Sequence, residues 1–180
     1  MPLPPPASDR KALHHREIRV VGFAREDGMF DIEGQLLDYK EVDFNLASGL
    51  RRAGEPVHTM WLRITVDRKL VIHDAAAATD AMPYAGFCET ITGEYRKLVG
   101  LHIGPGFKDK LRHLLGGTHG CTHLTELVNT VATTAFQTLA GAGAQDPQRK
   151  PFQLDRCHAL KSSGPAVARY YPRWFSGHRE

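Results

Sequence analysis

Three cysteines and the residues around them offer the most chemistry in this chain. Cys88, Cys121 and Cys157 are widely spaced, and no Cys-x-x-Cys pair occurs. An odd number of thiols excludes a complete disulfide framework. The missing Cys-x-x-Cys pair excludes a zinc ribbon or zinc finger. The thiols are therefore either small buried apolar residues or parts of a functional site.

Cys121 is the strongest single candidate. It follows Gly120, stands between His119 and His123, and lies at the expected start of a long helix. A helix N-terminus favours a thiolate, because the helix dipole is positive there. A thiolate beside imidazoles suits a soft metal or a nucleophile with a histidine base. Ten histidines in the chain also make such a neighbour common by chance.

The elements that must position these residues follow from the spacing of apolar residues. Alternation over 18–24, 29–37, 57–66 and 70–75, with an Asp-Gly turn after the first run, predicts a four-stranded antiparallel meander. A polar loop is expected over 45–56. Helical spacing predicts helices over 84–98 and 107–115 and a long helix from 122 that ends at Gly141, with a short strand over 98–103. The prediction is an α+β fold, an antiparallel β-meander with helices packed on one face.

Length and composition set the organisation. With 180 residues, 42% hydrophobic and 24% charged, the chain suits one globular domain rather than a collagen-like, coiled-coil or disordered protein. We expect a flexible Pro-rich tail over 1–16, with His14 and His15 unstructured, a single α+β domain over 17–175, and a flexible C-terminus over 176–180.

Charge and hydropathy bear on location and partners. A net charge of +3 is too small to indicate nucleic acid, and no apolar run is long enough for a membrane span. No targeting signal is recognised, so we expect a cytoplasmic protein with reduced thiols. We expect no nucleic-acid or membrane partner, and both a small-molecule substrate and a homo-oligomer are left open.

Four short motifs resemble a bacterial family known as domain-of-unknown-function family 2889. They are Arg-Glu-Asp-Gly-Met-Phe-Asp-Ile-Glu-Gly at 25–34, Ala-Gly-Glu-Pro-Val-His at 53–58, Gly-Cys-Thr-His-Leu at 120–124, and Cys-His-Ala-Leu at 157–160 before Tyr-Pro-Arg-Trp at 171–174. The resemblance implies no activity, only a setting in bacteria that degrade aromatic and acyl-CoA-linked compounds.

The second half is also similar in order to the NifU/SufE-like iron–sulfur scaffold fold. There a first cysteine precedes an edge strand, a second follows glycine at the start of a long helix, and a third opens a later helix. This resemblance implies that Cys88, Cys121 and Cys157 converge, with His158 as a fourth ligand and Asp155, His119 or His123 as alternatives. Such a site would bind zinc or iron.

Three functions therefore remain open, and they include both catalytic and non-catalytic roles. The first is a Cys/His metal site, structural if it is closed and a hydrolase or lyase site if one position is open to water. The second is a metal-free acyl-transfer enzyme in which Cys121 is the nucleophile and His119 or His123 the base. The third is an accessory or binding module with structural cysteines.

Overall fold

The computed structural model describes residues 3–140 and 148–177. It divides into two compact units, Met1–Ala142 and Gly143–Glu180. The first holds a sheet with helices and the second a short helical segment. The predicted single domain over 17–175 stays a prediction.

Four long antiparallel strands form the sheet of the first unit. They are β1 (His14–Ala24), β2 (Phe30–Lys40), β5 (Pro56–Val66) and β6 (Ile72–Ala81), in the spatial order β1-β2-β5-β6. The turn between β1 and β2 closes with an Arg25 N–H···O=C Met29 bond of 2.9 Å, and Gly28 takes a φ of 82°. The predicted α+β class and antiparallel meander are confirmed.

The prediction that His14 and His15 are unstructured is wrong. Both open β1, where His14 pairs with Lys40 and His15 with Tyr39. The His15 ring stacks on the Tyr39 ring with centroids 4.7 Å apart. Cross-strand pairing with β2 therefore orders these residues, although the sequence assigned them to the tail.

A small hairpin occupies the segment that was predicted as a polar loop. Strand β3 (Phe44–Leu46) pairs with β4 (Gly49–Arg51). Gly49 has a φ of 127°, a conformation that side chains rarely adopt. Three pairs are too short a run for the alternation of apolar residues to show in the sequence.

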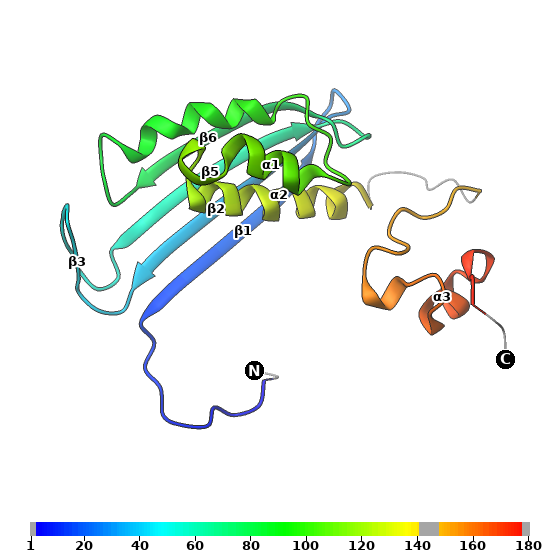
Figure 1. Ribbon diagram of the computed structural model, residues 1–180, viewed down its shortest axis with the longest axis horizontal. Coiled ribbons are helices and arrows are strands. Elements are labelled where there is room, and N and C mark those ends of the chain that lie inside the picture. The colour runs from blue at the N-terminus through cyan, green and yellow to red at the C-terminus, as the bar shows by residue number, and fades with distance from the viewer. Residues whose placement is uncertain (1–2, 141–147, 178–180) are drawn as a thin grey trace. The chain divides into compact units, whose positions relative to one another are not determined.

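Helices cover one face of the sheet (Figure 1). They are the 3-10 helix η1 (Cys88–Leu98), α1 (Phe107–Leu115), the 3-10 turn η2 (Gly117–His119) and α2 (Thr122–Ala140). Both predicted α-helices over 107–115 and from 122 are confirmed. The helix predicted over 84–98 begins only at Cys88 and is 3-10, and the strand predicted over 98–103 reduces to one bridge between Val71 and His102.

The core lies between the sheet and α2. Gly34 on β2 allows the close approach, because a Cβ there would lie 2.6 Å from Val131 of α2. Gly22 on β1 does the same for Thr138. Inward-facing strand residues meet one face of α2 in a single buried cluster, which includes Ile32, Leu36, Met60, Leu62, Ile64, Tyr95, Leu98, Leu111, Leu124, Leu127, Val128 and Val131.

The second unit contains η3 (His158–Leu160), α3 (Pro165–Tyr170) and η4 (Pro172–Trp174). Leu154 and Val167 are its buried apolar residues. Among the described residues of both units, no helix is long and apolar enough to cross a membrane.

Candidate functional site

A buried carboxylate forms the centre of the candidate site. Asp38, near the end of β2, is 1% exposed. Arg16, its partner in the β1–β2 register, donates to both carboxylate oxygens, from Nε to Oδ1 and from Nη2 to Oδ2, at 2.8 Å each. Burial opposes ionisation of Asp38, but the hydrogen bonds and charge of Arg16 outweigh it and lower the pKa of Asp38. The site therefore holds a fixed negative charge.

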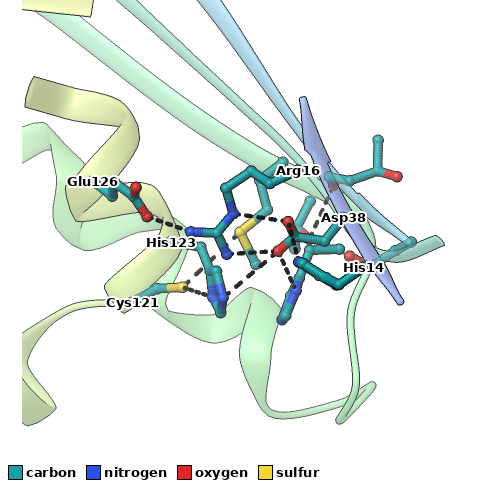
Figure 2. A network of polar contacts seen from close by, with 11 residues as sticks. His14, Arg16, Asp38, Cys121, His123 and Glu126 are labelled. Carbon is teal, nitrogen blue, oxygen red and sulfur yellow. Dashed lines mark hydrogen bonds and ion pairs between the residues drawn. The ribbon is translucent and has the colours of Figure 1, made fainter. Parts of the chain in front are cut away.

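Three imidazoles surround this carboxylate. His58 on β5 lies opposite Asp38, with Nδ1 3.1 Å from Oδ2. His123 in the first turn of α2 places Nε2 3.8 Å from the same oxygen. His14 places Nε2 3.4 Å from Oδ1. Figure 2 shows Asp38 between Arg16, His14 and His123.

Two of these histidines are held in the neutral form. Burial is the main cause that lowers the pKa of His58, and repulsion by the positive charge that His123 carries when protonated adds to it. Burial likewise lowers the pKa of His123, followed by the nearby Arg16 charge. The two rings lie against each other with centroids 3.8 Å apart. Neutral imidazoles can accept protons or bind a metal.

Cys121 lies beside His123 just before α2 begins. Its Sγ is 3.9 Å from His123 Nδ1 and 4.0 Å from Met60 Sδ. Sulfur, imidazole and carboxylate thus follow one another in space, as Figure 2 shows for Cys121, His123 and Asp38. If Nε2–H of His123 faces Asp38, Nδ1 is left free to accept the thiol proton.

Tyr95 fixes the backbone of Cys121. The Tyr95 side chain is fully buried, and its hydroxyl accepts the Cys121 N–H at 3.1 Å. The same hydroxyl lies 2.9 Å from the Cys121 carbonyl oxygen and 2.9 Å from Thr125 Oγ1. Burial raises the pKa of Tyr95, so the hydroxyl keeps its proton. The thiol is therefore held at one place on the helix start.

The residues predicted from sequence are placed as follows. Cys121 and His123, the predicted catalytic residues, come together. Cys88 is half-buried at the start of η1, whereas Cys157 and His158 are exposed in the second unit. The metal set of Cys88, Cys121, Cys157 and His158 is thus divided between the units and stays a prediction.

The alternative fourth ligands have other partners. His119 is exposed, with Nδ1 3.3 Å from the Gly116 carbonyl oxygen. Asp155 forms an ion pair with Lys150 at 2.9 Å.

Asp38, His58, Arg16 and His14 were missed from sequence. The signal was present, because inward-facing residues of a strand recur every second position. His58 extends the series Met60, Leu62, Ile64 by one step. Arg16 and His14 continue the face of Ile18, and Asp38 follows Leu36. Polar residues on an otherwise apolar face mark the site.

A metal-capable group exists within this cluster. In the described part of the chain, one ligand atom each from Asp38, His58 and His123 can be chosen so that all lie within 4.8 Å of one another. Two imidazoles and a carboxylate suit Zn²⁺ or Fe²⁺ with positions left open. The Arg16 cation, bonded to the same carboxylate, opposes a second positive charge.

Comparisons with known proteins give one match. A family model described as "Protein of unknown function (DUF2889)" matches residues 14–137. This range contains every residue of the cluster, from His14 to Glu126. No curated protein and no solved structure matches the chain.

Proposed function

The chain belongs to the DUF2889 family, whose function is unknown, and we propose that it is a cysteine-dependent acyl-transfer enzyme. Cys121 is the nucleophile, His123 the general base, and Asp38 the group that orients the base. One observation carries the proposal. A thiol, a neutral imidazole and a buried carboxylate lie next to one another in space. His123 Nδ1 is 3.9 Å from Cys121 Sγ, and His123 Nε2 is 3.8 Å from Asp38 Oδ2.

The reaction that suits this arrangement is attack on a thioester or another activated acyl group. His123 Nδ1 takes the thiol proton while Sγ bonds to the carbonyl carbon. The bond from that carbon to the leaving sulfur breaks, and His123 gives its proton to the departing thiolate. Water then attacks the carbonyl carbon of the acyl-enzyme while His123 takes one of its protons. The bond from that carbon to Sγ breaks and His123 returns the proton to Sγ, so the whole reaction releases a thiol and a carboxylic acid.

The charge pattern supports this use of Asp38. Arg16 holds both carboxylate oxygens and also pairs with Glu126, so Asp38 stays ionised at neutral pH. An ionised carboxylate keeps the Nε2–H tautomer of His123 and stabilises the imidazolium formed during proton transfer. The first-turn N–H groups of α2, which lack intrahelical acceptors, are available to stabilise a developing oxyanion.

Two further expectations belong to this proposal. A reactive thiol requires a reducing compartment, which agrees with the expected cytoplasmic location. A thioester substrate agrees with the bacterial, acyl-CoA-linked setting expected from the family resemblance. The similarity of the second half to the iron–sulfur scaffold fold would instead require the three thiols to meet, and only Cys121 lies in the cluster described above.

Acylation of the protein tests the proposal. Purified protein is incubated with S-phenyl thioacetate, and the acetylated residues are found by mass spectrometry. We expect one acetyl group, on Cys121, that is absent in Cys121→Ser and retained in Cys157→Ser. Because the acyl group is removed by water in the proposed reaction, thiophenol release is followed as well. No acetylation of Cys121 together with thiophenol release no faster than in Cys121→Ser, or equal acetylation of all three thiols, would contradict the proposal.

A metal site is the second candidate function, favoured by the grouping of Asp38, His58 and His123. Such a site would use Zn²⁺ or Fe²⁺ to polarise a carbonyl or activate water for hydrolase or lyase chemistry. In that case His123 is a ligand rather than a base, so the two functions are alternatives.

Zinc titration by calorimetry separates them. If the metal site exists, His58→Gln weakens Zn²⁺ binding at least about tenfold, and Arg16→Gln strengthens it by removing a competing cation. The control is His73→Gln, because His73 also pairs with a carboxylate, Asp67, at 3.1 Å but lies outside the cluster. Equal zinc binding in all variants would exclude the site, and acetylation of Cys121 after chelator treatment would favour the thiol mechanism.

A further inference from the structure

A pocket lies at the same end of the sheet as the polar cluster. Its volume is about 370 Å³, and its walls come from the β3–β4 hairpin and from the segment after β6. The strand register defines the shared end. Ala81, the last residue of β6, pairs with Thr59, which is next to His58 on β5. Pockets of this size commonly hold small molecules.

The walls of the pocket are apolar and exposed. Leu50 and Tyr84 are each 46% exposed, and Phe87 is 79% exposed. Pro83 and Ala85 complete the apolar lining. Exposed large apolar side chains that gather around a hollow usually mark a binding surface. Two aromatic rings favour a flat apolar ligand.

One charged side chain lines the pocket. Arg51 is half-buried, and its Nη2 donates to the Met82 carbonyl oxygen at 2.9 Å. Within residues 3–140 and 148–177, no carboxylate pairs with this guanidinium. The neighbouring Arg52 differs, because it pairs with Asp43 at 2.8 Å. Arg51 is thus anchored by one nitrogen and keeps other N–H groups for a ligand.

The lining residues include no carboxylate. Glu89, which follows in the chain, accepts the Gly86 N–H at 2.7 Å and is not among them. Ser48 is bonded to the Pro83 carbonyl oxygen, which joins the two walls. The pocket therefore combines an apolar surface with one unpaired positive charge.

We propose that this pocket binds an aromatic carboxylate, with the ring against Tyr84 and Phe87 and the carboxylate on Arg51. Guanidinium binds carboxylates through paired hydrogen bonds, which a neutral amide cannot reproduce. The binding does not require reaction at Cys121, so it can be tested separately from the acyl-transfer function. If both hold, the pocket is the place where an aromatic acid product or acyl group lies.

Calorimetric titration with benzoate and with benzamide tests this proposal. The two probes have nearly the same shape and differ in charge. We expect benzoate to bind in the millimolar range, as suits so small a ligand, and benzamide at least about tenfold more weakly. Cys121→Ser should bind benzoate like the unmodified protein, so a failure of the acyl-transfer proposal leaves this result unchanged.

Two pocket variants and one control complete the experiment. Arg51→Gln keeps an N–H donor for the Met82 carbonyl oxygen but removes the charge, and it should weaken benzoate binding at least about tenfold. Phe87→Ala, at an exposed site, should weaken it severalfold. Arg52→Gln removes a neighbouring charge outside the pocket and should have no effect. Equal binding of benzoate and benzamide, unchanged binding in Arg51→Gln, or no binding of benzoate would overturn the proposal.

Discussion

The two units each place a cysteine, a histidine and an aspartate close together in sequence or in space, but in different surroundings. In the first unit Asp38 lies on β2, His123 in α2 and Cys121 directly before α2. In the second unit Cys157 and His158 follow Asp155 closely in the chain, and His158 begins η3. The Asp38 side chain is 2% exposed, and that of Asp155 is 47% exposed.

The contacts of the two carboxylates show what the difference means. Asp155 accepts the Ser162 hydroxyl at 2.6 Å, the Lys150 ammonium at 2.9 Å and the Ser162 N–H at 2.7 Å. The Ser162 hydroxyl bond, then Lys150, lowers the pKa of Asp155. All these contacts stabilise the segment between Lys150 and Ser162. Asp38 instead contacts imidazoles from two strands and one helix. The same residue types therefore form a proton path only where the fold buries them together.

Replacing the histidine of each unit should give the largest difference. His123→Gln removes the base beside Cys121 and should slow acetylation by S-phenyl thioacetate about 10²–10⁴-fold. His158→Gln is the control, because His158 is exposed beside Cys157. Mass spectrometry over time measures the rate of Cys121 acetylation in both variants. Equal rates would contradict the role of His123 as the base.

Replacing the carboxylate of each unit should lower the free energy of unfolding by different amounts. Asp38→Asn removes the buried charge that binds Arg16 and His58, leaves Arg16 with only its exposed partner Glu126, and should lower the free energy of unfolding by about 3 kcal/mol. Asp155→Asn should cost much less, because water can replace the lost contacts of an exposed group. Urea unfolding at pH 7 measures both. A larger loss of unfolding free energy in Asp155→Asn would show that the Asp155 contacts, and not those of Asp38, contribute more to stability.

Replacing a tyrosine hydroxyl should have a smaller effect. Tyr95→Phe leaves the Cys121 N–H without its acceptor in the core, and should cost about 1–2 kcal/mol of unfolding free energy. Tyr171→Phe is the matched change in the second unit, where the hydroxyl accepts one bond from Gln153 at 3.3 Å. Its cost should be lower. Urea unfolding of both variants provides the comparison, and equal losses would contradict the bracing role of Tyr95.

The smallest effect is expected from pH. Burial holds the pKa values of His58 and His123 below 6.5 in the folded protein, so the unfolded chain binds more protons in mild acid. Stability should therefore begin to fall as the pH drops below about 6.5. The contribution of Asp38, whose pKa is lowered from 3.8, is lost only at more acidic pH, as the pH falls through its folded pKa.

Unfolding free energies measured between pH 7.5 and pH 5 check this, with the range chosen around the ordinary histidine pKa of about 6.5. His58→Gln should flatten the slope, and His158→Gln, which replaces an exposed imidazole, serves as the control. If unfolding free energy depends on pH equally steeply in His58→Gln and in the unmodified protein, His58 is not a buried imidazole held neutral.

The sequence predicted the framework better than the site. Alternation over four strands and the apolar stripe of the long helix are local signals, so the meander and α2 followed from them. Cys121 and His123 were found because they lie two residues apart. Asp38 and His58 are far from them in sequence and meet them only through strand register and the packing of α2, which no local pattern specifies.

A different reason explains why the start of β1 was predicted as part of the tail. His14 and His15 are polar, so their composition does not separate a strand from a tail, although His14 continues the alternating face of Ile18. Pairing with Lys40 and Tyr39 orders both residues. The convergence of the three cysteines was implied by a resemblance in order along the chain. Cys157 lies in the second unit and Cys121 in the first, so that convergence stays a prediction.

The rate of alkylation of each thiol tests the central claim most directly. Cys157 is exposed and Cys121 half-buried, so access alone would make Cys157 the faster to react with iodoacetamide at pH 7. The proposed site predicts the reverse order, with Cys121 faster than Cys157 and slowed in His123→Gln but not in His158→Gln. Fastest modification of Cys157, with no change at Cys121 in His123→Gln, would contradict the proposal.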